Sequence, residues 1–240
     1  MIHISQRERS IRNRAAYFVE FWGCFLVTLT MYLMNRVTSL LTPFVAGASY
    51  FLAVFLAYRI SGGYVNAAVT VAMWMKEKDK EHAKYAIYIL MQILGGFLAA
   101  IVIKCINLEL VIPDSAHGSG LVQAIIVVAF LTFLLCLIYL HMRESIKPTA
   151  DSVVAGTVIG GAFFMVSLAL EAGTGGLINP SVAVAVGLAK LIFAIETSNP
   201  IYWWILAPFV GAVFSSWFFK KYLERDPLKA PVKRSFLVPD

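Results

Sequence analysis

The sequence contains little charge for its length. Only 14% of its 240 residues are charged, compared with about 25% in a typical soluble domain. Hydrophobic residues make up 60% of the chain, compared with about 45–50% in soluble domains, and the mean hydropathy is +0.77. A water-soluble core cannot account for this excess, so we expect lipid to contact most of the surface.

Side chains that would support metal, redox or enzymatic chemistry are also scarce. The three cysteines, Cys24, Cys105 and Cys136, are widely spaced and form no Cys-x-x-Cys pair, which argues against a disulfide framework or a zinc site. The four histidines lack metal-ligand spacing, and no nucleophile–base pair recurs at helical spacing. We therefore expect no cofactor, no metal and no enzymatic activity. The net charge of +6 does not indicate nucleic-acid binding, because the basic residues lie between apolar segments.

Six apolar segments are long enough to cross a bilayer, for which a helix needs about 20 residues. They are Ala16–Asn35, Phe44–Ile60, Tyr85–Ile106, Gly120–Leu140, Val153–Leu170 and Tyr202–Tyr222. Two shorter apolar runs, Asn66–Met75 and Asn179–Ala189, follow the second and fifth segments. Because runs this short cannot cross, we expect each to enter the membrane and turn back, or to lie at its interface.

This layout predicts an all-α membrane protein built from two similar halves. Each half has three spans, with a short helix after the second, and an odd number of spans makes the halves inverted. We expect a basic N-terminal segment at 1–15, a membrane domain at 16–222 and a basic tail at 223–240 that contacts lipid. The halves run from about 16 to 106 and from about 120 to 222.

The basic residues predict the orientation. If the six spans alternate, 17 of the 20 Lys and Arg residues fall on one side, and only Arg36, Lys104 and Lys190 fall on the other. The positive-inside rule then predicts a multi-pass protein with both termini on the cytoplasmic side. The Arg-rich start of the chain leaves an organelle membrane open, and the sequence does not identify the membrane.

Two loops that precede the short apolar runs are alike. Residues 61–70 have the sequence SGGYVNAAVT, and residues 174–183 have the sequence TGGLINPSVA. Asn66 and Asn179 stand where helix N-caps would stand, and Pro180 suits the first helical position. Matching half-helices in two inverted halves indicate a site at the bilayer midplane.

These stretches resemble the aquaporin, or major intrinsic protein, family. Residues 60–70 are similar to its motif I-S-G-x-x-x-N-P-A-V-T, with Ala67 for the proline, and residues 174–181 are similar to T-G-x-x-x-N-P-A, with Ser181 for the alanine. The resemblance covers about residues 16–222 and implies six transmembrane helices plus two re-entrant half-helices in an inverted repeat. Further family-like pieces follow in the family's order at 20–23, 92–95, 132–133 and 202–211.

The resemblance also implies which residues form the site. The pore motif would consist of Asn66, Ala67, Ala68, Asn179, Pro180 and Ser181. A selectivity filter would lie at Ala46, where the family usually has a bulky aromatic residue, and at Ser167, Gly176 and Val182. The family nearly always has arginine at the position of Val182, so we expect a filter that is wider, less polar and uncharged. Such a pore either passes larger neutral solutes or is nonfunctional and closed by other side chains.

The resemblance also implies a structural role for the carboxylate of Glu20. Glu20 matches the first-helix glutamate that braces a re-entrant loop in the family, whereas its counterpart in the fourth helix is Val128 here. We therefore expect one brace to be present and the other to be missing. We expect Glu171 to be an exposed charge near the outer mouth, since it lies eight residues before Asn179.

The chemistry of the motif favours small neutral solutes. Helix N-termini carry partial positive charge that repels cations. The amides of Asn66 and Asn179 can donate to a passing molecule, and the paired glycines at 62–63 and 175–176 can run extended with carbonyls toward the lumen.

These features leave three functions to consider. A passive channel for water or small uncharged, glycerol-like solutes fits best, and the family implies a homotetramer surrounded by lipid. The alternative is a transport-inactive scaffold, or a subunit of a larger membrane complex, which the missing proline, arginine and second glutamate favour. An ion-coupled transporter would need partnered charges at membrane depth, and only Glu20 is placed there.

Overall fold

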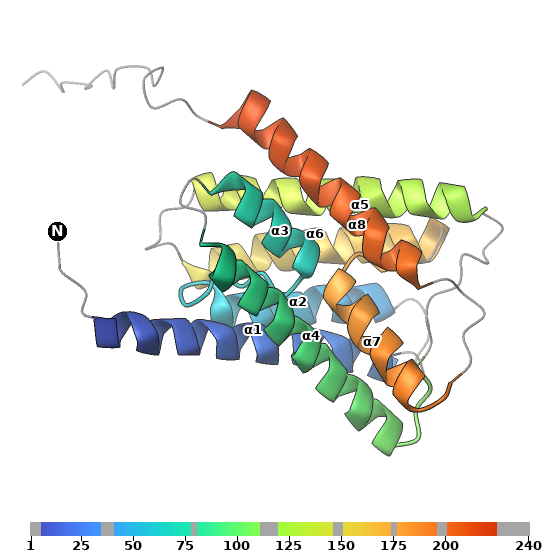
Figure 1. Cartoon of the computed structure of the whole chain (residues 1–240). Coiled ribbons are helices and arrows are strands. Elements are labelled where there is room, and N and C mark those ends of the chain that lie inside the picture. Colours follow the sequence, from blue (N-terminus) through green and yellow to red (C-terminus); the bar gives the residue numbers. More distant parts are fainter. Residues whose placement is uncertain are drawn as a thin grey trace, which may run out of the picture.

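The computed structural model describes residues 6–34, 41–77, 81–110, 120–145, 151–173, 177–195 and 201–224. These parts of the chain form eight α-helices and no strand (Figure 1). The helices are α1 (Gln6–Met34), α2 (Thr42–Ala57), α3 (Ala67–Lys76), α4 (His82–Cys105), α5 (Leu121–Ser145), α6 (Ser152–Gly173), α7 (Pro180–Ile192) and α8 (Tyr202–Phe218), which continues as the π-helical turn η2 (Phe219–Leu223).

The lengths of these helices match the predicted layout, with one difference. Helices α1, α4, α5, α6 and α8 are long and apolar enough to cross a membrane. Helix α2, the second predicted span, has 16 helical residues and is therefore about 24 Å long. It is shorter than expected because the chain turns after Ala57 and reaches Gly62 and Gly63, which both have positive φ. The 10-residue α3 and the 13-residue α7 are too short to cross.

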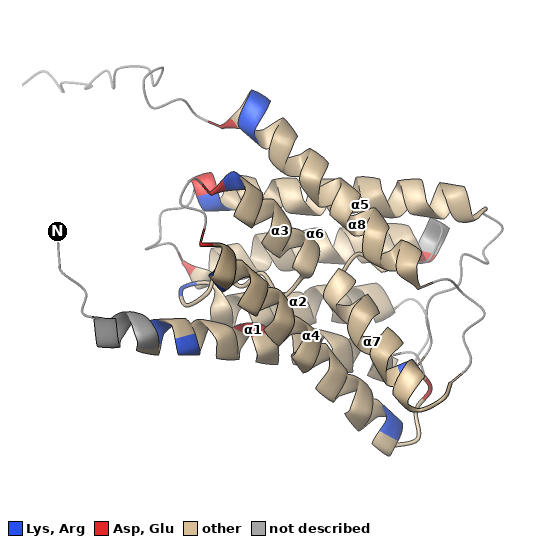
Figure 2. Cartoon of the chain, in the orientation of Figure 1, with Lys and Arg blue, Asp and Glu red and all other residues tan. Residues whose placement is uncertain are grey.

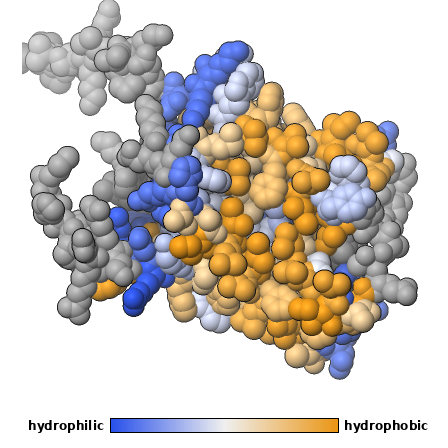
Figure 3. Space-filling model, in the orientation of Figure 1, coloured by the Kyte–Doolittle hydropathy of each residue, from blue (hydrophilic) through white to orange (hydrophobic). Residues whose placement is uncertain are grey.

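The outer surface has the apolar character that lipid requires. A broad belt of hydrophobic residues covers the middle of the molecule (Figure 3). Large apolar side chains of several helices point outward, among them Phe44, Val122 and Leu191, which are 64%, 69% and 78% exposed. This surface identifies an integral, multi-pass membrane protein.

Charged residues gather at the two ends of the bundle, mostly at the end where α1 begins (Figure 2). At that end Lys76 of α3 pairs with Glu144 of α5 at 2.5 Å, and Lys220 donates to the carbonyl of Met75. Lys104 lies in the last turn of α4, at the opposite end from Lys84 in its first turn. The basic residues therefore lie at the ends of the helices, outside the apolar middle of the bundle (Figure 2).

The two halves pack through close helix contacts that need glycine. α2 packs on α6 across the middle, α1 on α4 in the first half, and α5 on α8 in the second. A Cβ added at Gly95 would lie 2.1 Å from the Phe21 carbonyl oxygen, and one at Gly211 would lie 2.2 Å from that of Ala129. Gly47 and Gly160, each nineteen residues before its asparagine, face each other between α2 and α6.

Candidate pore centre

Both short helices begin at the asparagines of the repeated loops. Asn66 has extended backbone, and its side-chain oxygen accepts from the Ala68 N–H at 2.8 Å. Asn179 does the same for the Ser181 N–H at 3.0 Å, with Pro180 at the first helical position. Each side chain thus satisfies a free N–H of its own helix and presents its NH₂ group beyond the helix end.

The two helix ends meet in the middle of the molecule. The Asn66 Nδ2 donates to the Ile178 carbonyl at 3.1 Å, and the Asn179 Nδ2 donates to the Val65 carbonyl at 2.8 Å. Each asparagine therefore binds the residue that precedes the other one. Asn66 is 0% exposed and Asn179 is 4% exposed, so water has almost no access to either side chain.

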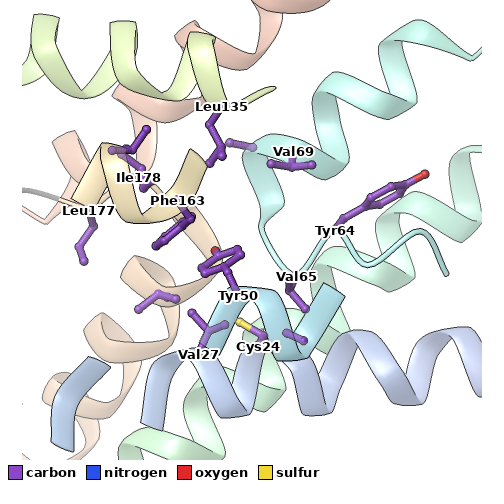
Figure 4. Close-up of a cluster of buried hydrophobic side chains, with 14 of the residues drawn as sticks. Cys24, Val27, Tyr50, Tyr64, Val65, Val69, Leu135, Phe163, Leu177 and Ile178 are labelled. Atoms are coloured by element: carbon purple, nitrogen blue, oxygen red, sulfur yellow. The ribbon is translucent and has the colours of Figure 1, made fainter. Parts of the chain in front are cut away.

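Two aromatic rings occupy the space beside this contact. Tyr50 of α2 and Phe163 of α6 stack face to face, with ring centroids 3.5 Å apart and planes 17° apart. The second Nδ2 contact of Asn179 goes to the Tyr50 hydroxyl at 3.1 Å. Figure 4 shows the rings next to each other, between the entry to α7 and Val65 of the first loop. Tyr50 is fully buried, and the Asn179 amide is occupied by protein atoms.

Glu20 of α1 holds the first loop. One carboxylate oxygen accepts from the Ser61 hydroxyl at 2.5 Å and the Tyr64 N–H at 3.0 Å, and the other accepts from the Val65 N–H at 2.8 Å. Val65 has a φ of 43°, which is strained for a β-branched residue. These three bonds, formed at a fully buried carboxylate, hold the loop in that conformation.

Gln92 of α4 extends this network to the second half. Its Nε2 donates to Glu20 at 2.7 Å and to the Thr70 hydroxyl at 2.9 Å, while its Oε1 accepts from the Ser181 hydroxyl at 3.1 Å. Thr70 and Ser181 lie on α3 and α7. One buried carboxylate is therefore linked to both short helices.

The glycines of the first loop have backbone angles that other residues rarely adopt. The φ values are 108° at Gly62 and 64° at Gly63, and residues 62–65 form neither a helix nor a turn. The Gly63 carbonyl accepts from the Tyr139 hydroxyl at 3.1 Å. This carbonyl is thus bound to a side chain of α5.

The expected filter positions lie one helical turn from the aromatic pair. Ala46 precedes Tyr50 by four residues on α2, and Ser167 follows Phe163 by four on α6, so each shares a helix face with its neighbour. Ala46 is buried and Ser167 is half-buried. Val182 of α7 is 1% exposed, and Gly176 lies outside the described residues.

The second loop has no carboxylate brace at the expected place. Val128 is fully buried on α5, and residues 174–176, including the glycine pair, lie outside the described part of the chain. Glu171 lies in the last turn of α6 and is half-buried, so it is less exposed than expected. At the matching positions Glu20 and Val128, side-chain support is therefore present for the first loop and absent for the second.

Sequence analysis missed the central aromatic pair. Tyr50 lies sixteen residues before Asn66, and Phe163 lies sixteen residues before Asn179, so the repeat relates the two positions. Comparing the halves position by position would have paired the two positions, but it would not have shown that the rings stack beside the asparagines. The hydrogen bonds of Gln92 to Ser181 and Thr70 could not be found by comparing the halves, because they depend on how three helices pack in space.

A polar cavity of about 430 Å³ opens beside the first loop at the basic end of the bundle. Its walls include Ser61 and Gly62 of the loop and residues of α1, α4 and α5. Its charged residues are Arg12, Arg59, Glu81, Lys84 and Arg143. Because four basic side chains outnumber one carboxylate among these lining residues, the cavity has a positive electrostatic potential.

Comparisons with known proteins agree with the fold and the repeated loops. The chain is 32% identical over 207 residues to "Probable aquaporin-5" of Gibberella zeae, a match that covers 79% of this chain and 36% of that protein. It is 30% identical over 215 residues to "Glycerol uptake facilitator protein-like 6" of Lactiplantibacillus plantarum, covering 83% of this chain and 94% of that protein.

A solved structure extends the agreement to three dimensions. The X-ray structure of the aquaglyceroporin from Plasmodium falciparum matches with a TM-score of 0.76 at 20% identity, covering 88% of this chain and 96% of that one. At this identity the likeness concerns the fold. The family profile described as "Major intrinsic protein" matches residues 10–219. With this match, its two half-helices and its meeting asparagines, the chain belongs to the major intrinsic protein family.

Proposed function

We propose that this chain forms a passive transmembrane channel for water or small uncharged solutes. The observation that carries the proposal is the meeting of Asn66 and Asn179 at the ends of α3 and α7. Two helix N-termini at one point give a positive potential that disfavours cations. The names of the two relatives, an aquaporin and a glycerol uptake facilitator-like protein, agree with this class of solute.

The interior argues against ion-coupled transport. Among the described residues, Glu20 is the one acidic side chain that is fully buried, and it accepts four hydrogen bonds in total. A coupling site needs a charge that can gain or lose its partner during transport. Glu20 instead serves the loop, which supports a passive mechanism.

Stopped-flow light scattering on proteoliposomes tests the channel. We expect water or glycerol to cross faster than in protein-free vesicles of the same lipid. Rates equal to those of empty vesicles, for the wild type and for variants at the centre, would contradict the proposal. They would favour the second candidate, a transport-inactive scaffold or subunit of a larger membrane complex, which the burial of Asn66 and Tyr50 supports.

The wide, uncharged filter is part of the same proposal. Ala46, Ser167 and Val182, with Gly176, would leave a broader passage than the arginine and aromatic residue usual in the family. Val182→Arg is then expected to lower glycerol flux more than water flux. A flux ratio that stays unchanged would mean that Val182 does not line the passage.

Orientation and assembly complete the proposal. The basic ends of α1, α3, α5 and η2 are placed on the cytoplasmic side by the positive-inside rule, with both termini there. We further propose a homotetramer embedded in lipid. Protease accessibility of tagged termini in sealed cells, and the mass of the detergent-purified protein by light scattering, test these two statements.

A further inference from the structure

The aromatic side chains of α2 and α6 stand in an unusual place relative to the filter positions. One turn away, Ala46 and Ser167 are small, whereas Tyr50 and Phe163 at the level of the asparagines are large. Tyr50 and Phe163 are 0% and 5% exposed, and their rings stack at 3.5 Å. The bulk that would narrow the passage at the filter is found at the asparagines instead.

We propose that Tyr50 and Phe163 form the constriction that decides what crosses this channel, and that the Tyr50 hydroxyl bound to Asn179 is its latch. The inference rests on the proposed channel function. The two positions are equivalent in the repeat, sixteen residues before their asparagines, so each half of the molecule contributes one ring to the stack. The structure then represents the closed arrangement.

The latch uses the group that a permeating molecule needs. Asn179 donates one Nδ2 hydrogen to the Val65 carbonyl and the other to the Tyr50 hydroxyl. The first bond holds the loop. The N–H of the second bond is the donor from which a water or an alcohol could accept. A solute with a hydroxyl group can take the place of the Tyr50 hydroxyl and keep the number of hydrogen bonds made by Asn179 unchanged, whereas an apolar solute leaves one N–H of that amide unpaired.

The neighbouring residues give the ring a direction in which to move. The small side chains of Ala46 and Ser167 lie one turn along the same helix faces, so rotation toward them meets less steric resistance. The small residues at the filter positions therefore leave room for the rings of the central constriction to move.

Permeability of proteoliposomes containing the full chain tests this assignment, with water and glycerol measured separately. Tyr50→Val removes both ring and hydroxyl and is expected to raise at least one of these rates about tenfold or more over the wild type. Phe163→Ala is expected to raise the same rate by a smaller factor, because the latch remains. Tyr32→Val changes a buried tyrosine of α1 away from the asparagines, and its rates should equal those of the wild type.

Tyr50→Phe separates the latch from the ring. It keeps the stack and fills the same volume, so the protein folds, and the loss of one hydrogen bond predicts a rate about 3- to 10-fold above the wild type. A rate equal to the wild type would overturn the latch. If Tyr50→Val and Phe163→Ala also match a conducting wild type, the constriction is overturned while the channel stands. If no variant exceeds empty vesicles, the channel function itself fails.

Discussion

The two halves of the molecule share their backbone plan but not their polar interior. Where helices approach each other, related positions carry the same residue, as Gly47 and Gly160 do between α2 and α6. Where the loops need support, related positions differ: Glu20 accepts four hydrogen bonds, and Val128 can accept none with its side chain. The repeat therefore sets the helix paths, and the first half supplies the polar anchoring.

The second half depends on the first for part of its support. Ser181 reaches the Glu20 network through Gln92, and Asn179 donates to the carbonyl of Val65, whose N–H is held by Glu20. A single carboxylate thus stabilises the first loop directly and the start of α7 through one intermediate side chain. Substitutions at single residues can test this difference between the halves.

The cysteines provide a way to measure such changes. Cys24 and Cys136 are buried, and Cys105 is exposed, with no disulfide among them. In a Cys105→Ser background, a maleimide dye should label the two buried thiols only as the protein unfolds. The midpoint temperature of labelling in detergent then reports the stability of each variant.

The largest effect is expected for Glu20→Ala. It removes the acceptor of four buried donors, of which the Ser61 hydroxyl keeps a longer contact to the Ala57 carbonyl, and this should lower the free energy of unfolding by more than about 3 kcal/mol. The labelling midpoint should fall steeply, or the protein should not be recovered folded. Glu171→Ala, at a half-buried carboxylate of the other half, is the control and should stay near the wild type. Equal shifts for both would remove the claimed asymmetry.

In contrast to the carboxylates, the interhelical glycines of the two halves should be equally important for stability. Gly95→Ala and Gly211→Ala each place a methyl group about 2 Å from a backbone carbonyl oxygen of the facing helix. Because backbone cannot move aside easily, each should cost about 3 kcal/mol and lower the midpoint to a similar extent. Gly161→Ala has no atom within 4 Å of the added Cβ and serves as the control. Unequal effects at the two positions would show that the halves pack differently.

Much of this architecture could be predicted from the sequence, because it depends on local patterns. Helix lengths follow from apolar runs, and Asn66 and Asn179 are recognisable as caps. The stack of Tyr50 on Phe163 could not be predicted in the same way, because aromatic residues are common in apolar helices. Only the geometry of α2 against α6 brings these rings to the asparagines.

A smaller loss is expected for Gln92→Met, which keeps the size of the side chain. It removes the donors to Glu20 and Thr70 and leaves the Ser181 hydroxyl without its partner. A cost of about 2 kcal/mol follows from unpaired buried groups. Gln123→Met, at a glutamine that accepts from the exposed Gly120 N–H, is the matched control. A Gln92 variant as stable as this control would mean that the halves are not coupled through α4.

The smallest effect is expected for Ser181→Ala, which restores the alanine usual in the family motif. Losing the single bond to Gln92 should lower stability by about 1 kcal/mol, since one neutral hydrogen bond contributes little net free energy. The same substitution made together with Gln92→Met should then cost nothing further, because the partner is already absent. Additive costs in this double-mutant cycle would place the value of the Ser181 hydroxyl elsewhere and leave the second half without its link to Glu20.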